Sequence, residues 1–325
     1  MTYNKFMTFY LKYRPQNVEE LDIASVRNSL NKIIESGQIP HAFLFAGPKG
    51  TGKTSTARIL AKIINCENKK PPCNKCDNCI SIAGGSNIDI IEMDAASNRG
   101  IDDIRALRDI IKLAPAKLKS KVYIIDEAHM LTTEASNALL KTLEEPPAHV
   151  YFILATTNPE KLIDTIKSRT TLVQFTKATA EETKRSVSRI VASEKITITD
   201  TEIDTIIKIS KGSFRDAVKL LEQHTNDKNF LKSQNNFDAG KLISFILSKE
   251  ADKALLEIDN AMKNGVRVES LTTEVLTLLQ LKLIEEKSDV IIKLIGLILS
   301  AQEFNKVSPI EELPLQIAII KWCNL

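Results

Sequence analysis

The sequence predicts an α/β domain built on a parallel sheet with flanking helices, followed by two all-helical regions. Short apolar runs alternate with helical patterns through the first half of the chain, which is typical of parallel sheets. After about residue 178 the strand signals stop and helical periodicity continues to the end. At 325 residues the chain is long enough for two or three domains.

Four buried strands with helical patterns between them make up the predicted sheet region. The first strand covers residues 42–46 and runs directly into Gly47. Asp126 and Thr157 follow the third and fourth strands, so both are expected at the carboxyl edge of the sheet, where such folds bind ligands. The remaining predicted elements are strands at Ile88–Met93, Val122–Ile125 and Val150–Ala155, and helices at Thr54–Ile64, 101–112 and 133–145.

The second half of the chain predicts helices only. Residues 179–225 have the pattern of short helices, and long amphipathic helices are expected at Leu242–Met262 and Glu269–Ile284. The polar stretch Asn226–Asn236 separates the two groups, and we expect a domain boundary there.

Composition predicts a soluble cytoplasmic protein. Hydrophobic residues make up 43% and charged residues 26% of the chain, an ordinary globular balance. The first residues lack the apolar core of a signal peptide, and no stretch of 18 apolar residues occurs, so no membrane segment is expected. From Phe237 onward there are 10 basic and 13 acidic residues, against 34 and 28 before it, so a polyanion is expected to meet the first part.

A glycine-rich loop between the first strand and its helix predicts a nucleotide site. Its glycines let backbone N–H groups surround a phosphate, Lys53 can reach the β- and γ-phosphates, and the Thr54 hydroxyl can ligate Mg²⁺. The motif G-x-x-x-x-G-K-[ST] is formed by Gly47, Pro48, Lys49, Gly50, Thr51, Gly52, Lys53 and Thr54.

Two acidic residues after the third strand predict the hydrolytic half of the same site. Asp126 is expected to hold Mg²⁺, and Glu127 to orient and deprotonate the attacking water. Thr157, after the fourth strand, is placed to donate to that water or to the γ-phosphate. By residue type alone, Arg169 and Arg215 are ordinary surface arginines.

Further motifs occur in a fixed order along the chain: Tyr13-Arg14-Pro15, the phosphate loop, Asp126-Glu127-Ala128-His129, Thr156-Thr157, Ser168-Arg169 and Gly212-Ser213-Phe214-Arg215-Asp216-Ala217. Two more stretches stand out, Ala95–Asp103 and Asn137–Pro147. The ordered motifs resemble those of AAA+ clamp loader ATPases, and the two stretches resemble the bacterial DNA polymerase III gamma/tau family in particular.

The resemblance implies roles for residues that composition leaves unassigned. Thr157 is similar to the first sensor, and Arg215 to the second sensor, which reads the γ-phosphate in its own chain. Arg169 is similar to the arginine finger that reaches a neighbouring subunit's ATP. Tyr13, Arg14 and Pro15 are similar to the segment near the adenine. One departure is Thr170, where the family usually has Cys.

The resemblance also implies domains and partners. The expected domains are an AAA+ ATPase domain over residues 1–178 with a zinc knuckle at 66–79, a helical lid over 179–236 and an oligomerising helical collar over 237–325. The implied partners are delta-type and delta-prime-type subunits, further copies of this chain in a ring, the sliding clamp and primer-template DNA. No polymerase or nuclease constellation of carboxylates is visible.

Four of the five cysteines predict a structural metal site. Four thiolates are enough for one tetrahedral Zn²⁺ with no open position. Reduced, unbound cysteines and an iron–sulfur cluster are the alternatives, and the family resemblance favours zinc. The four are Cys66, Cys73, Cys76 and Cys79, and Cys323 stands apart from them.

DNA contacts are the least specific part of the prediction. Arg99, Arg105 and Lys141 lie at or near predicted helix starts, and in similar clamp loaders such groups track duplex phosphates. The alternative is that these three residues belong to a solvated basic face that does not bind DNA.

Two other functions fit parts of the sequence. A branch-migration helicase also has an arginine finger and an Asp-Glu pair, but it lacks the cysteine knuckle and the helix at 140–145. A non-catalytic scaffold subunit would tend to lose the phosphate loop, which this chain keeps.

Overall fold

The computed structural model describes residues 8–97, 100, 110–228, 230–231, 238–305 and 308–324. The chain forms two compact units, Met1–Asn226 and Asp227–Leu325. The first contains a parallel sheet with flanking helices, and the described residues of the second are helical, which confirms the predicted fold class. No helix in the described ranges is long and apolar enough to cross a membrane.

The sheet has five parallel strands in the order β2-β3-β4-β1-β5. The central strands β1, β3 and β4 are buried along almost their whole length, because helices cover both faces of the sheet. The strands are β1 (Ala42–Ala46), β2 (Ile90–Asp94), β3 (Lys121–Asp126), β4 (Val150–Thr156) and β5 (Thr171–Gln174).

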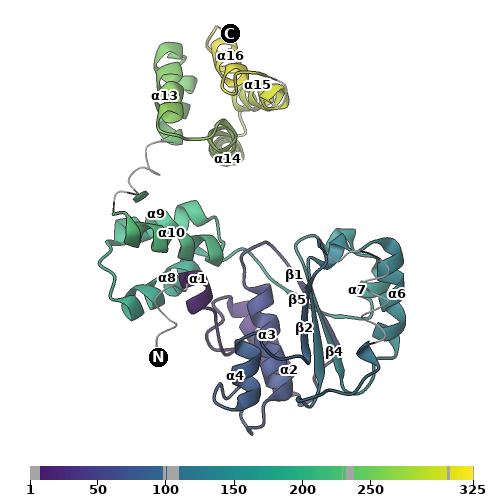
Figure 1. Cartoon of the computed structure of the whole chain (residues 1–325). Coiled ribbons are helices and arrows are strands. Elements are labelled where there is room, and N and C mark those ends of the chain that lie inside the picture. The colour runs from purple at the N-terminus through teal and green to yellow at the C-terminus, as the bar shows by residue number, and fades with distance from the viewer. Residues whose placement is uncertain are drawn as a thin grey trace. The chain divides into compact units, whose positions relative to one another are not determined.

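Helices pack on both faces of the sheet and create two apolar cores (Figure 1). On one face, Leu30 and Leu60 from α2 and α3 are fully buried against Phe43 and Phe45 of β1. On the other, Leu139 of α6 packs against the opposite side of β3 and β4. The helices on the first face are α2 (Ala24–Glu35), α3 (Lys53–Asn65) and α4 (Asp77–Ala83); those on the second are α6 (Thr133–Glu144) and α7 (Asp164–Lys167), with 3-10 turns η1 (Ala128–Met130) and η2 (Pro159–Lys161).

Three further helices complete the first unit, and a short N-terminal helix packs with them. Reciprocal capping boxes fix two of their starts, Thr179 with Glu182 and Thr199 with Glu202. These helices are α8 (Ala180–Glu194), α9 (Asp200–Ser210) and α10 (Phe214–Asn226), and the N-terminal one is α1 (Phe9–Lys12).

The second unit is a helical bundle with its own core. Trp322, the single tryptophan, is buried there, and its indole N–H donates to the carbonyl of Ile246 at 2.9 Å. The helices are α12 (Ala239–Leu247), α13 (Ala251–Lys263), α14 (Val268–Glu286), α15 (Asp289–Asn305) and α16 (Leu313–Cys323).

Several predicted boundaries were wrong. The single helix expected at Leu242–Met262 is two helices, because Lys249 adopts a left-handed backbone with φ of 58° and ends the first. The second strand begins at Ile90 rather than Ile88. The fifth strand, β5, was not predicted, since four residues at the sheet edge carry too little pattern. Most of the helix predicted at 101–112 lies outside the described residues.

The sheet unit depends on a buried carboxylate before β2. Asp89 is 1% exposed and accepts the backbone N–H groups of Ala116 (2.9 Å), Lys117 (2.7 Å) and Leu118 (2.9 Å). Burial raises the pKa of Asp89, but the three N–H donors and Lys121 together lower it by more. The net pKa therefore lies below the ordinary value. The charged form of Asp89 therefore holds the turn that leads into β3.

We expect Asp89→Asn to destabilise the sheet unit by about 2 kcal/mol, because one charged acceptor of backbone N–H bonds is lost. Since folding lowers the pKa of Asp89, the stabilisation is present at neutral pH and is lost as pH falls below about 4. Hydrogen exchange of β3 amides measures it. Asp238→Asn, which keeps an equivalent cap on α12, is the control and should change nothing. Unchanged β3 protection in Asp89→Asn would contradict the role given to this carboxylate.

Candidate nucleotide and metal sites

The loop between β1 and α3 has the geometry of a phosphate site. Gly47, Gly50 and Gly52 have φ values of 151°, 80° and 97°, which glycine adopts most readily. A Cβ on Gly47 would lie 2.1 Å from the carbonyl oxygen of Phe175, and one on Gly50 would lie 2.0 Å from Ser213 Oγ. The loop therefore packs against the end of β5 and against the start of α10, with no room for side chains at these points.

Lys53 is the first residue of α3 and folds back over this loop. Its ammonium donates to the carbonyls of Gly47 (2.7 Å) and Pro48 (2.9 Å), and the residue is 6% exposed. Burial lowers the pKa of Lys53, while the carboxylates of Glu127 and Asp126 oppose that shift. A phosphate that accepted hydrogen bonds from the ammonium would stabilise this desolvated positive charge. The partial positive charge at the N-terminus of α3 would attract the same anion.

The end of β3 brings the two predicted acidic residues to the loop. Thr54 Oγ1 donates to Asp126 Oδ2 at 2.9 Å, so a hydroxyl and a carboxylate, both oxygen ligands suited to Mg²⁺, lie together. Glu127 has a left-handed backbone, φ 48°, and its Oε2 accepts from Thr157 Oγ1 at 2.8 Å. The neighbouring strands β3 and β4 thus hold Asp126, Glu127 and Thr157 at one sheet edge.

A pocket opens above this edge, and the residues lining it come from three parts of the first unit. The phosphate loop and the acidic pair form one wall, Tyr13, Arg14 and Pro15 another, and α8 and α10 the third. The apolar stretch of the lining suits a flat base, and the loop end suits phosphates. Residues lining the pocket that sequence reasoning missed include Tyr10, Leu21, Asp22, Ile23, Val26, Ser186, Arg189, Phe214 and Val218.

Arg215 lies at the point where α10 meets the loop. Its side chain lines the pocket, and its backbone N–H donates to the carbonyl of Gly50 at 3.4 Å. Burial, then Arg58 and Arg215, lower the pKa of Arg14 on the adjacent wall. Crowded cations in a partly buried pocket repel one another, and a polyphosphate between Arg14 and Arg215 would relieve that repulsion.

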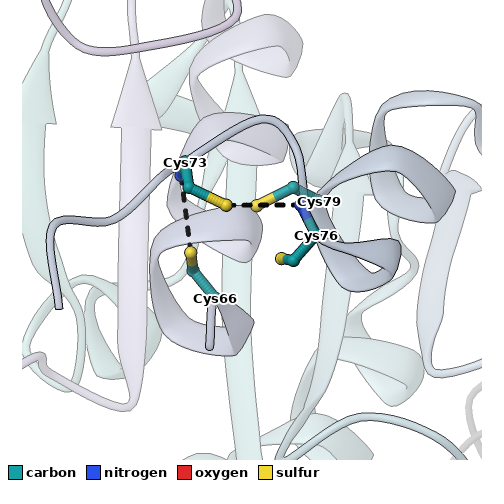
Figure 2. Close-up of side chains that lie close together, drawn as sticks. All are labelled: Cys66, Cys73, Cys76 and Cys79. Atoms are coloured by element: carbon teal, nitrogen blue, oxygen red, sulfur yellow. Dashed lines mark hydrogen bonds between the residues drawn. The ribbon is translucent and has the colours of Figure 1, made fainter. Parts of the chain in front are cut away.

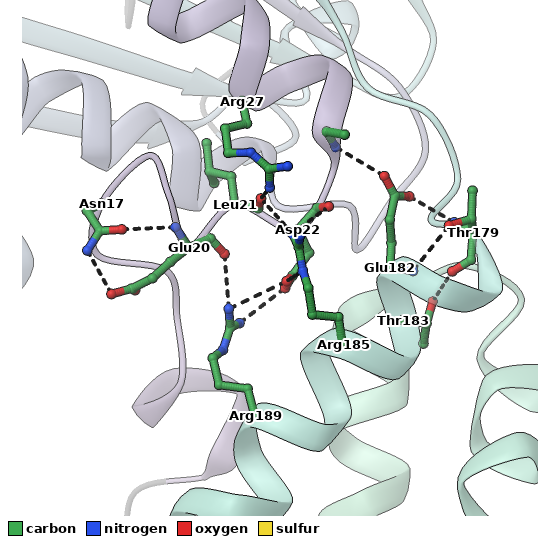
Figure 3. Close-up of polar contacts among 11 residues, drawn as sticks. Asn17, Glu20, Leu21, Asp22, Arg27, Thr179, Glu182, Thr183, Arg185 and Arg189 are labelled. Carbon is green, nitrogen blue, oxygen red and sulfur yellow. Dashed lines mark hydrogen bonds and ion pairs between the residues drawn. The ribbon is translucent and has the colours of Figure 1, made fainter.

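An ion-pair cluster ties α8 to the wall formed by the N-terminal segment (Figure 3). Asp22 is 6% exposed and accepts from Arg185 Nε at 3.2 Å and from Arg189 Nη2 at 3.1 Å. Glu182, the capping residue of α8, accepts the backbone N–H of Ala24 at 3.1 Å. No sequence pattern marks these pairs, because Asp22 and Arg189 are 167 residues apart and only the fold joins them.

Three of the other predicted site residues that the structure describes, Thr157, Lys141 and Arg169, are not part of the pocket lining. Arg169 is at the surface, where its guanidinium pairs with Glu144 at 2.6 Å. Thr157 contacts Glu127 and is not among the residues that line the pocket. Lys141 is exposed on α6. Arg99 and Arg105 lie outside the described residues, so their proposed DNA contacts stay predictions.

The four clustered cysteines meet in a knuckle between α3 and α4 (Figure 2). The four Sγ atoms all lie within 4.8 Å of one another. Backbone N–H groups of Cys73 and Cys76 donate to Cys66 Sγ and Cys73 Sγ, each at 3.4 Å. Such donors favour the thiolate, the form that binds metal.

The surroundings of the sulfurs fit one divalent cation. Burial raises the pKa of the Cys79 thiol, whereas backbone N–H donors from Lys75 and Cys76 lower the pKa of Cys73. Four sulfur donors at one point are the set that a closed tetrahedral zinc site uses, and no ligand position is left for catalysis.

Comparison with known proteins finds similarity to subunits of bacterial DNA polymerase III. Residues 24–179 match the family described as DNA polymerase III, delta subunit. The tau subunit of DNA polymerase III from Bacillus subtilis is 39% identical over 273 residues, which cover 80% of this chain and 48% of that protein. The Escherichia coli tau subunit is 37% identical over 281 residues, covering 82% and 44%. The chain thus spans about half the length of these relatives or less.

Among solved structures, the Holliday junction branch migration motor RuvB from Thermotoga maritima is similar with a TM-score of 0.51. Its sequence is 21% identical, and the match covers 81% of this chain and 88% of that one. At this identity the likeness shows the fold alone.

The five-stranded sheet, the phosphate loop and the helices that follow define the class of this molecule, an AAA+ type P-loop protein. Within that class, the chain is similar to the tau and gamma/tau subunits of bacterial DNA polymerase III, with identities of 39%, 43% and 37% to three of them.

We expect Gly50→Ala to weaken nucleotide affinity on the order of tenfold, because its Cβ would displace Ser213 and strain the loop. Adding Ser213→Gly should recover part of the affinity, since the steric conflict disappears and only backbone strain remains. Titration with a fluorescent nucleotide measures both. Gly37→Ala, at an open position with φ of 69°, controls for strain elsewhere. Parental affinity in Gly50→Ala would contradict the contact between loop and α10.

Proposed function

We propose that this chain is the ATPase motor subunit of a DNA polymerase III clamp loader, using ATP to load the sliding clamp onto primed DNA. The observation that carries the proposal is the assembly of Lys53, Thr54, Asp126 and Glu127 at one sheet edge, beneath a wall that includes Arg215. The similarity to DNA polymerase III tau and gamma/tau subunits supports the biological setting of this proposal.

Each residue at the sheet edge has a different role in the proposed hydrolysis of ATP. Lys53 and the loop amides would hold the β- and γ-phosphates, and Thr54 and Asp126 would hold Mg²⁺, which would supply positive charge against those phosphates. Glu127 orients the attacking water and accepts its proton. The Thr157 hydroxyl donates to the Glu127 carboxylate, which supports a sensor role because any ligand that reorients Glu127 must change that contact.

Helices α8–α10 are proposed to act as the lid of the ATPase domain. Arg215 supports this, since it lines the pocket from α10 and lies against the loop through Gly50. ATP that bridges the loop and Arg215 would hold the lid closed, and loss of the γ-phosphate would remove one of the charges that attract Arg215. The division at about residues 178 and 236 into ATPase domain, lid and collar is part of this proposal.

Arg169 is proposed to act on the ATP of a neighbouring subunit. Its exposed position, paired with Glu144 and away from the lining of its own pocket, supports a role in trans. The neighbours would be copies of this chain and delta-type or delta-prime-type subunits in a ring, and the ring would bind the clamp and primer-template DNA.

The cysteine knuckle is proposed to hold structural Zn²⁺. The all-sulfur donor set and the distances between the Sγ atoms support zinc. The metal would order the loop from Cys66 to Cys79 rather than take part in hydrolysis, because all four positions are filled by cysteine.

A branch-migration motor is the second candidate, supported by the likeness of the fold to RuvB. The identity of 21% is well below the 39% to the Bacillus subtilis tau subunit. The chain also has the cysteine cluster, which the family resemblance implies for gamma/tau subunits and not for branch-migration helicases. We therefore favour clamp loading.

Lys53→Ala is expected to abolish ATP binding, because the loop loses the cation that contacts the phosphates. Glu127→Gln should bind ATP with parental affinity but hydrolyse it on the order of a hundredfold more slowly, as expected for loss of a general base. Steady-state phosphate release and nucleotide titration measure the two effects. Glu134→Gln, exposed on α6, is the matched control. Parental hydrolysis by both variants would refute the assigned site.

A further inference from the structure

A buried lysine contacts one residue next to each of the two candidate sites, Gln16 beside the pocket wall and Asn74 in the cysteine knuckle. Lys62, on the third turn of α3, is 1% exposed. Its ammonium donates to Gln16 O at 2.5 Å, Gln16 Oε1 at 2.9 Å and Asn74 Oδ1 at 2.8 Å. An ammonium has three N–H donors, so these contacts use its full capacity. A charge that is buried so completely is costly unless each donor is satisfied, which makes both partners necessary.

On one side, the hydrogen bond to Asn74 connects Lys62 to the cysteine knuckle. Asn74 directly follows Cys73 in the knuckle, two residues before Cys76, and has a left-handed backbone with φ of 57°. Burial lowers the pKa of Lys62, so its charge depends on the three acceptors around it. Four thiolates around a divalent cation keep a net negative charge, which a buried ammonium nearby offsets.

On the other side, the hydrogen bonds to Gln16 connect Lys62 to a wall of the candidate nucleotide pocket. The Gln16 side chain that accepts from Lys62 also donates, through Nε2, to the carbonyl of Arg14 at 3.1 Å. The backbone N–H of Gln16 donates to Glu20 Oε2 at 2.7 Å. Arg14 and Pro15 line the pocket, so Gln16 orients the backbone of that wall.

We propose that Lys62 is a positioning residue that couples metal occupancy of the cysteine knuckle to nucleotide affinity, through the path Asn74–Lys62–Gln16–Arg14. This inference rests on the nucleotide and metal binding proposed above. Metal fixes the loop that carries Asn74, Asn74 and Gln16 together fix the ammonium, and Gln16 holds the wall against which the nucleotide binds. Coupling of this kind is reciprocal, so bound nucleotide also tightens metal binding.

The alternative is that Lys62 only stabilises the packing of α3. A purely structural role would lower stability and would leave the dependence of nucleotide affinity on metal unchanged. The decisive quantity is therefore the change in nucleotide affinity on metal removal, compared between the parent and variants that break the path.

The experiment titrates the full chain with a fluorescent ATP analogue in Mg²⁺ buffer, in a metal-loaded form and after stripping with a zinc chelator. Metal content is followed by elemental analysis and by the thiolate absorption of bound Co²⁺. In the parent, metal removal should weaken affinity about tenfold, within the usual range of coupling between sites. Lys62→Met should start weaker, and metal removal should then change its affinity by less than about twofold.

Matched variants separate the path from its surroundings. Lys119 donates to the carbonyl of Cys66 at 3.3 Å, so Lys119→Met disturbs the knuckle but not the path and should keep the parental coupling. If Lys62→Met does not fold, Gln16→Ala and Asn74→Gly each remove one link at partly or fully exposed positions, and glycine tolerates the backbone of Asn74. Both should lose the coupling.

The inference is overturned if the chain purifies without metal, or if metal removal leaves the nucleotide affinity of the parent unchanged. It is also overturned if metal removal changes nucleotide affinity equally in the parent and in the path variants. Failure of the metal-loaded parent to bind the nucleotide at all would instead refute the proposed function. The two failures are therefore distinguishable.

Discussion

The close contact between the phosphate loop and its neighbours is the constraint on which the rest of the nucleotide site depends. At Gly47 the loop lies against Phe175 at the end of β5, and at Gly50 it lies against Ser213 at the start of α10. Because no side chains occupy these positions, the loop can approach both neighbours, and Lys53 folds back over its carbonyls. The loop therefore fixes both the candidate phosphate site and the place where α10 meets it.

The short segment before α2 connects the loop to more distant parts of the first unit. It supplies the Tyr13–Pro15 wall, pairs with α8 through Asp22, and contacts α3 through Gln16 (Figure 3). A movement of the lid that preserves the Asp22 ion pairs must carry this segment with it. Such an arrangement joins the pocket, α8 and the cysteine knuckle through one shared segment. The buried Lys62 is tolerated beside it because each of its three N–H donors has an acceptor.

Much of the sheet and the chemical site could be predicted, because their requirements are local. A strand, a glycine loop and a helix are visible in consecutive residues, and so is the pair Asp126-Glu127 at a strand end. The Asp22 pairs and the path through Lys62 could not be predicted, since their partners come from separate elements. The break at Lys249 was missed because an ordinary residue adopts the left-handed backbone there. Arg169 and Arg215 stood out only through the family resemblance, and the DNA contacts stay predictions.

The central claim is that this chain works as an ATPase whose sites are completed by neighbours in a ring. Mixing subunits that carry only Arg169→Ala with subunits that carry only Lys53→Ala tests it most directly, in a loader reconstituted with clamp and primed DNA. If Arg169 acts in trans, interfaces that pair an intact Lys53 site with an intact Arg169 will recover part of the stimulated hydrolysis. Activity that simply follows the fraction of unmutated chains, with no recovery at mixed interfaces, would contradict the claim.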